Sequence, residues 1–279
     1  MRLTGLTTKG NSHVKSTVRR KQIRTLSALL LGSVLLSGCS FDNEYGRLGM
    51  PEPATEEGNR ILSLWQGSWL AALIVGVLVW GLLIWAIVAY RRKEGDGLPE
   101  QTRYNVPLEI LYTVAPLLMI LALFYFTQRD QTILTKVDDS HSHSVNVVGW
   151  RWSWAFNYLD EDVYEVGTPG EPPVLWLPVD EKVRFELTSP DVIHSFWVPA
   201  FLMKMDLVPG RVNEFAVTPT QEGVFMGKCA ELCGVDHSRM LFDVKVVTRA
   251  EYDAHIADLK ERGQIGKIDS GRTDIAGVS

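Results

Sequence analysis

The chain of 279 residues contains no Cys-x-x-Cys-His sequence and only three cysteines. A covalently attached haem of the c type is therefore excluded, so any haem partner would have to be a separate protein or domain. No nucleophile or acid–base pair is needed for chemistry of the chain's own, and we expect no independent catalysis. We also expect no nucleic acid among its partners.

Acidic residues are missing from residues 1–39, which carry seven Lys or Arg, whereas residues 130–279 carry 14 basic and 24 acidic residues. The basic start precedes the apolar run 26–36, which is too short to span a membrane and is typical of a signal peptide. It ends in Leu36-Ser-Gly-Cys39, which resembles a bacterial lipobox. We therefore predict a lipoprotein signal peptide over residues 1–38 and lipidation of Cys39. The alternative is a plain signal peptide with an incidental cysteine.

Charge is also missing from residues 61–90, and 46% of the whole chain is hydrophobic. Because about 20 apolar residues cross a bilayer, this run predicts a membrane-spanning helix. Arg91-Arg-Lys93 follows it, and positive residues collect on the cytoplasmic side. The resulting limits are residues 39–60 for an extracytoplasmic segment, 61–90 for the first span, 91–106 for a cytoplasmic loop, 107–128 for the second span and 129–144 for a linker.

Short runs of branched and aromatic residues follow, separated by Gly, Pro or Asp. This spacing predicts an all-β sandwich or barrel over residues 145–248. Thr248 and Glu251 form a capping-box pattern that predicts a helix within the C-terminal part, residues 249–279. The predicted strands are 145–148, 152–158, 174–176, 183–187, 215–217 and 241–247. Because side chains alternate along a strand, we predict one aromatic face made of Trp150, Trp152, Trp154, Phe156 and Tyr158.

A cluster of metal-binding residue types lies in the twelve residues Cys229-Ala-Glu-Leu-Cys-Gly-Val-Asp-His-Ser-Arg-Met240. Thiolate, thioether and imidazole are ligands that suit copper. One further ligand is expected upstream, and His194, in an apolar run between Pro190 and Pro199, is the candidate. Two thiolates could bridge two coppers, each capped by one histidine.

Other interpretations of these residues remain. The two cysteines could form a disulfide, although so short a loop gives little stabilisation. A zinc site is possible, although methionine is not a usual zinc ligand. A lone methionine often only fills a core, and a lone histidine such as His194 is often structural. A carrier that binds and delivers one copper would also use two thiols and a methionine, but it would have no need of two spans.

At these residues the chain resembles subunit II of the haem-copper cytochrome c oxidases, in which Cys-x-Glu-x-Cys-x-x-x-His-x-x-Met and an upstream His-Ser hold the binuclear copper centre CuA. The resemblance extends from the two spans to about Val247. It implies a cupredoxin-like Greek-key domain after the membrane hairpin. It also implies a magnesium or manganese ion that the Glu231 carboxylate shares with subunit I. The implied copper ligands are His194, Cys229, Cys233, His237, Met240 and the backbone carbonyl of Glu231.

The resemblance further implies a subunit that takes single electrons from cytochrome c outside the cytoplasmic membrane. The electrons would pass to haem a in subunit I, where oxygen is reduced to water and protons are pumped. Trp152 corresponds to the tryptophan at which electrons arrive, although Arg151 and Ser153 replace the more usual Gln and Tyr. Asp206 is a candidate for docking the cytochrome, since an acidic surface suits a basic partner.

Glu109, about one turn inside the second span, corresponds to a glutamate at the mouth of a proton-uptake channel. An ionisable group in a span is a functional candidate by default, and a helix-end carboxylate at the headgroups is the alternative.

Two related classes of protein would differ from this sequence in recognisable ways. A quinol oxidase would lack the copper ligands. A nitrous oxide reductase domain has the copper motif but would not be expected to contain the hairpin of two membrane spans.

Overall fold

The computed structural model describes residues 44–93, 95, 97–137, 140–168 and 170–268. The predicted signal peptide and Cys39 lie outside these residues. The chain divides into two units after Gly49. Of the first unit, the structure describes residues 44–49, which form turns. All helices and strands named below belong to the second unit.

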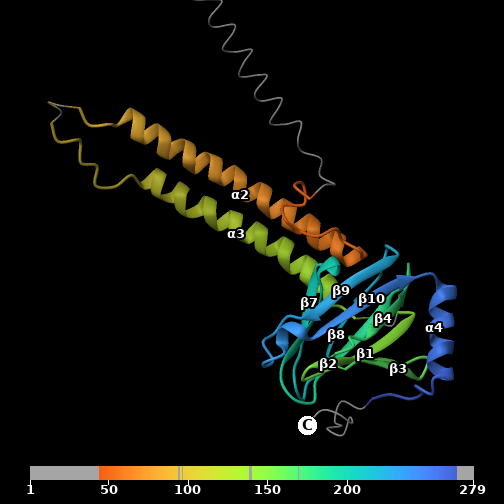
Figure 1. Cartoon of the computed structure of the whole chain (residues 1–279). Helices are drawn as coiled ribbons and strands as arrows, with labels where there is room; N and C mark the ends of the chain where they lie inside the picture. Colours follow the sequence, from red (N-terminus) through yellow and green to blue (C-terminus); the bar gives the residue numbers. More distant parts are fainter. Residues whose placement is uncertain (1–43, 94, 96, 138–139, 169, 269–279) are drawn as a thin grey trace, which may run out of the picture. The chain divides into compact units, whose positions relative to one another are not determined.

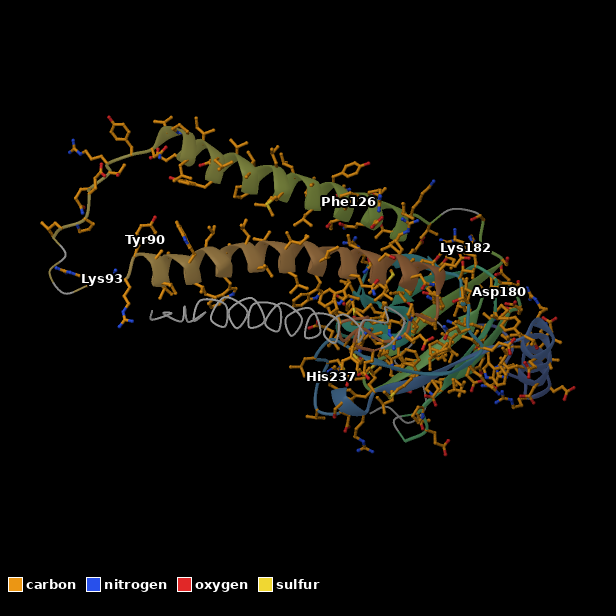
Figure 2. The ribbon with its side chains drawn as sticks, turned by 90° about the horizontal axis from the view of Figure 1, so that it is seen from above. Tyr90, Lys93, Phe126, Asp180, Lys182 and His237 are labelled. Atoms are coloured by element: carbon orange, nitrogen blue, oxygen red, sulfur yellow. The ribbon has the colours of Figure 1, made fainter. Side chains whose placement is uncertain are left out.

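Two long helices, α2 (Glu56–Ala89) and α3 (Val106–Leu134), form an antiparallel hairpin (Figure 1). Both are long and apolar enough to cross a membrane, and their apolar windows are not buried within the chain. Arg60 of α2 pairs with the buried Asp130 of α3 at 3.1 Å, which joins the start of one helix to the end of the other. Figure 2 shows Tyr90 and Lys93 at the opposite end, where the connecting loop begins.

The start of α2 is hydrogen-bonded to loops of the β domain. The Ala54 amide donates to the Ala200 carbonyl at 2.8 Å, and the Ala54 carbonyl accepts from the Thr220 amide at 2.8 Å. The Thr218 amide donates to the Glu57 carboxylate at 2.9 Å. Ala54 is fully buried in the same apolar core as the strands. Residues from before the hairpin therefore complete the fold that follows it.

The β domain is a sandwich of two five-stranded sheets, ordered β3-β2-β1-β5-β8 and β4-β10-β9-β6-β7. All neighbouring strands are antiparallel except the pairs β1–β5 and β4–β10. The six predicted runs fall on strands, and the strand-like run between Pro190 and Pro199 contains β6, whereas β3, β7 and β9 were not predicted. The strands are β1 (His143–Trp150), β2 (Ser153–Tyr158), β3 (Val163–Val166), β4 (Val174–Pro178), β5 (Val183–Thr188), β6 (His194–Val198), β7 (Met203–Leu207), β8 (Asn213–Val217), β9 (Gly223–Cys229) and β10 (Leu241–Val247).

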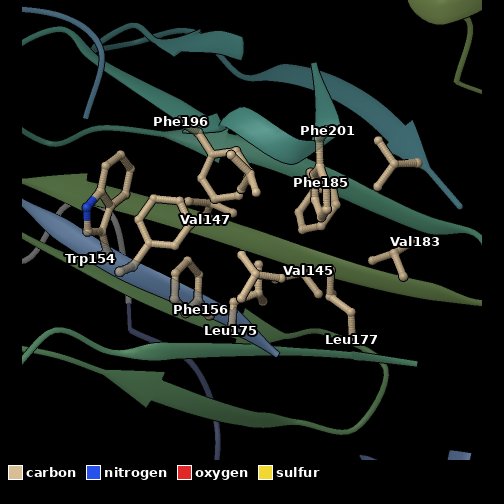
Figure 3. Packing of buried hydrophobic residues seen from close by; sticks show 14 of the residues in the cluster. Val145, Val147, Trp154, Phe156, Leu175, Leu177, Val183, Phe185, Phe196 and Phe201 are labelled. Carbon is tan, nitrogen blue, oxygen red and sulfur yellow. The ribbon is translucent and has the colours of Figure 1, made fainter. Parts of the chain in front are cut away.

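Aromatic rings fill the space between the two sheets (Figure 3). Phe196 stacks on Phe242 at a centroid distance of 4.8 Å, and Trp154 meets Phe242 edge-on at 5.1 Å. Each such pair contributes about 0.5–1.5 kcal/mol beyond the burial of its area. Gly227 leaves room for this cluster, because a Cβ there would lie 2.1 Å from the Phe242 ring. The cluster supports the strands that carry the candidate site.

The prediction of a single aromatic strand face over residues 150–158 was wrong. Trp150 ends β1 and pairs with Ser153 at the start of β2, so the chain turns back at Arg151 and Trp152. The prediction is correct for Trp154, Phe156 and Tyr158, which alternate along β2 and are all buried in the main core. Trp150 belongs instead to a small cluster with Val148 and Ala155.

The predicted C-terminal helix is confirmed as α4 (Arg249–Glu261), with Thr248 and Glu251 forming the capping box. Its buried face packs through Tyr252, and His255 stacks on Trp176 with ring centroids 4.3 Å apart. Burial, followed by the charge of Arg262, lowers the pKa of His255 to about 4. This histidine is therefore a packing residue, as its place on the helix indicates.

Candidate metal centre

Strand pairing brings the two sequence-distant parts of the site together. Phe196 of β6 is the partner of Cys229 at the end of β9, which places His194 beside the start of the loop 230–240. The Ala230 amide donates to the Ser195 carbonyl at 3.0 Å. The loop closes where the Cys229 amide donates to the Met240 carbonyl, also at 3.0 Å. The register of the sheet thus determines the geometry of the site.

Cys229 lies on the inner side of the site, between His194 and the second cysteine. Its Sγ is 3.9 Å from His194 Nδ1, 3.8 Å from Cys233 Sγ and 3.2 Å from the Glu231 carbonyl oxygen. Both thiols are free and buried. At 3.8 Å they are far beyond the roughly 2.05 Å of a disulfide. They are close enough to share an ion.

Cys233 lies on the outer side of the same group. Its Sγ is 3.7 Å from His237 Nδ1 and 3.8 Å from Met240 Sδ. Met240 is fully buried, whereas His237, on the short helix η2 (His237–Arg239), is partly exposed. The five side chains expected as ligands therefore form one continuous group, and each has a donor atom within 4 Å of another.

The chemistry of this group fits a thiophilic metal. The ligand atoms of His194, Cys229 and Cys233 all lie within 4.8 Å of one another. Burial raises the pKa of Cys229, but hydrogen bonds, first from His194, outweigh burial and lower the pKa overall. Burial, together with the neighbouring Cys229 charge, raises the pKa of Cys233. One thiol thus ionises readily and the second needs a positive partner.

Asp191 holds His194 from the side opposite the thiols. Its Oδ1 lies 2.9 Å from His194 Nε2, so the other nitrogen, Nδ1, faces Cys229. Burial opposes a charge on the ring, but the bond to Asp191 is stronger, and the pKa of His194 is raised. A carboxylate behind the imidazole is the usual way in which proteins fix the tautomer of a ligating histidine. Sequence reasoning missed Asp191, although its spacing three residues before His194 was visible.

Trp152 lies against the loop 230–240, called the metal loop below. Gly234 has φ of +129°, and a Cβ there would lie 2.9 Å from Cζ2 of the Trp152 indole. The indole is partly buried, and its Nε1 has no hydrogen-bond partner among the residues that the structure describes. The structure therefore brings this tryptophan to the site. Sequence reasoning also missed Gly234, which makes the close approach possible.

The remaining candidate residues lie elsewhere or differ in their surroundings. Glu231 has an exposed side chain, while its carbonyl faces Cys229. Asp206 lies on β7 with its carboxylate 3.9 Å from Lys204 Nζ. Glu109, in the first turn of α3, accepts a hydrogen bond from the Asn105 amide at 2.9 Å. That contact caps the helix, a role that was not among the two predicted.

Comparison with known proteins gives the family. The model for "Cytochrome C oxidase subunit II, periplasmic domain" matches residues 172–247. A protein of Streptomyces avermitilis called probable cytochrome c oxidase subunit 2 is 48% identical over 94% of each chain. The chain belongs to the cytochrome c oxidase subunit 2 family.

Two further proteins are less similar to this chain. Cytochrome c oxidase subunit 2 of Mycobacterium tuberculosis is 35% identical over 82% of this chain and 80% of its own. The crystal structure of the periplasmic domain of subunit II of the Bradyrhizobium japonicum cytochrome oxidase has 30% sequence identity, covers 44% of this chain and 96% of that one, and gives a TM-score of 0.41. The expected architecture, a membrane hairpin before a cupredoxin-like domain, is confirmed.

Proposed function

We propose that this subunit holds a binuclear copper centre, accepts electrons from cytochrome c and passes them to haem a in subunit I, where oxygen is reduced to water and protons are pumped. The observation that carries the proposal is the continuous group of five donor side chains. The ligands are His194, Cys229, Cys233, His237 and Met240, with the carbonyl of Glu231.

The donor set favours copper over zinc. The thioether of Met240 and two thiols are soft ligands, whereas structural zinc sites use Cys and His. A copper pair held by these residues would supply a centre that spreads one electron over two metals. The chain's contribution is to bury the thiols, exclude water from them and hold the histidine nitrogens toward them. A prearranged site of this kind keeps the reorganisation on electron transfer small.

Contact with the donor cytochrome is proposed to occur around the metal loop. Leu232 and Val235 are 78% and 86% exposed, although both are apolar. Exposed apolar residues that cluster on a functional loop favour a protein partner. The Trp152 indole packs against Gly234 of the same loop, which supports its role as the residue at which electrons arrive. Asp206 supplies a carboxylate that is 45% exposed, which suits an outer docking contact.

The roles of the two glutamates are proposed on separate grounds. The carboxylate of Glu231 is exposed, while its carbonyl faces Cys229, so this residue could join the copper centre to a magnesium or manganese ion shared with subunit I. Glu109 is proposed to stand at the mouth of the proton-uptake channel. Its contact with Asn105 makes capping the competing role. Replacement of Glu109 by Gln separates them, because a proton-path residue slows turnover whereas a cap changes only stability.

Cys39 is proposed as the lipidation site. Mass spectrometry of the mature N-terminus tests this directly, since a lipoprotein begins at residue 39 with an acyl-modified thiol. An unmodified N-terminus at another residue contradicts it.

The deciding experiment measures copper stoichiometry and the electron paramagnetic resonance spectrum of the full-length chain. Two coppers per chain, with one unpaired electron shared by two nuclei, are expected. One copper, or a spectrum localised on one nucleus, contradicts the electron-relay proposal and favours the copper carrier. The quinol-oxidase alternative is disfavoured, because all five ligand side chains are present and adjacent.

A further inference from the structure

The carboxylate of Asp191 is bonded on both of its oxygens. Oδ1 meets His194 Nε2 at 2.9 Å and accepts from the Val192 amide at 2.6 Å. Oδ2 accepts from the Arg151 amide at 2.8 Å and from Arg151 Nε at 3.2 Å. One side chain therefore connects the strand that carries His194 to the turn between β1 and β2.

That turn places Trp152. Arg151 immediately precedes it, and the indole lies against Gly234 in the metal loop. Trp152 Nε1 has no hydrogen-bond partner within the described residues, so the ring's own polar atom does not fix its position there. The position of Trp152 is fixed by the neighbouring backbone, which is bonded to Asp191, by the contact of the ring with Gly234 and by packing against the apolar core.

We propose that Asp191 is a positioning residue that aligns the copper ligand His194 and the tryptophan turn through the two oxygens of one carboxylate. The inference rests on the proposed function, since it assigns Trp152 the arrival of electrons. Displacing Asp191 disturbs both ends of the short path from Trp152 to the metal. The same carboxylate also provides a hydrogen-bonded connection from the Arg151 peptide to the imidazole.

Only a carboxylate can accept hydrogen bonds both from Arg151 and from the side of Val192 and His194. All of its contacts with Arg151, Val192 and His194 require an acceptor, and an ionised carboxylate is acceptor-only. An amide has one acceptor oxygen and one donor NH2 group. Asparagine at position 191 would turn its NH2 either toward Arg151, where it faces other donors, or toward His194. In the second case Nδ1 would carry the ring proton and could not bind metal.

The test compares Asp191→Asn with Asp236→Asn, measured in the purified oxidase complex. Asp236 is a carboxylate of the metal loop that pairs with Arg239 at 3.7 Å, so its replacement removes the same charge nearby. We expect Asp191→Asn to weaken copper binding by about 10–100-fold. We also expect a changed hyperfine coupling from one of the two histidine nitrogens in pulsed electron paramagnetic resonance. Asp236→Asn should leave both properties at wild-type values.

Equal copper affinity and nitrogen coupling in the two variants would overturn the proposal. If Asp191→Asn does not fold, Asp191→Glu replaces it, because the longer carboxylate keeps the charge but displaces the bonds. It should change the same nitrogen coupling, and an unchanged coupling would overturn the proposal equally.

The tryptophan side has its own measurement. Arg151→Ala removes the bond from Nε to Asp191 and keeps the bond from the backbone amide. We expect slower electron transfer from reduced cytochrome c with an unchanged copper spectrum, and an unchanged rate rejects this half of the proposal. A wild-type complex that accepts no electrons from cytochrome c would contradict the proposed function itself. The effect of Asp191 on copper affinity would still be decided by the comparison with Asp236→Asn.

Discussion

The two histidines of the candidate metal centre are held in different ways. His194 is fully buried on a strand of the sandwich, with Asp191 behind its ring. His237 is partly exposed on the short helix η2 (Figure 2) and meets Cys233 through Nδ1 at 3.7 Å. The structure gives it no carboxylate partner among the described residues. The sheet thus builds one half of the site, and the loop builds the other.

This difference indicates how the site forms. The position of His194 depends on the pairing of β6 with β7 and β9, which is made by the backbone and not by the ligand atoms. The loop half depends on a few local bonds, such as the His237 amide donating to the Gly234 carbonyl at 3.2 Å. We therefore expect metal to find His194 and Cys229 already in place and to fix the loop as it binds.

The largest effect is expected where the two halves meet. Cys233 contacts Cys229, His237 and Met240, so Cys233→Ser removes the only thiol of the outer half. The binuclear signature in the electron paramagnetic resonance spectrum should be lost. Retention of two coppers with a shared electron would show that the halves do not join at this thiol.

The comparison is tested directly by His194→Ala and His237→Ala in the metal-free chain. His194→Ala empties a fully buried position and removes one bond from the partly exposed Asp191, which together cost about 1–3 kcal/mol. His237→Ala is a change at a partly exposed site and should remain within about 0.5 kcal/mol. Chemical denaturation measures both. Equal losses of unfolding free energy would mean that the strand half is no more preformed than the loop half.

A third prediction concerns the contact of the loop with Trp152. Gly234→Ala adds a Cβ 2.9 Å from the indole at φ of +129°, whereas Gly210→Ala adds one in open space at φ of +76°. Backbone strain alone costs about 1–3 kcal/mol at either site. Only Gly234→Ala should also slow electron transfer from cytochrome c. Equal rates in the two variants would remove Trp152 from the path.

The smallest effect is expected at His255, which, unlike His194, has no carboxylate oxygen within hydrogen-bond distance among the described residues. His255 is buried on Trp176, and its nearest carboxylate oxygen, on Glu165, is 3.8 Å away. Because burial lowers its pKa to about 4, the unfolded chain binds the extra proton first as the pH falls below about 6.5. His255 should therefore reduce stability as the pH drops from about 6.5 to 4. His255→Gln should flatten this part of the profile of unfolding free energy against pH, and an unaltered slope would contradict the assignment.

Sequence alone predicted the elements whose pattern is long or chemically specific. The two spans follow from charge-free runs, and the ligand group follows from residue types that suit one metal. The turn at Arg151 and Trp152 was missed because it contains no Gly, Pro, Asn or Asp to indicate a hairpin. β9 was missed because Gly223 and Gly227 weaken its strand pattern.

Asp191 was missed for a different reason. Its importance comes from contacts with residues both three positions away and forty positions away, and only the folded chain brings Arg151 to it. Metal ligands form a motif because they share one ion, whereas residues that support them have no fixed spacing. Such residues become visible only in the structure.

The burial of Ala54 has a practical consequence for soluble fragments. A fragment cut after α3 would lack this residue, so the Ala200 carbonyl and the Thr220 amide would each lose a partner. A small void would also open in the apolar core, of which Ala54 is a fully buried member. The sandwich is therefore discontinuous in sequence, and we expect a water-soluble fragment that begins after α3 to gain stability when residues 50–55 are joined to its new N-terminus by a linker.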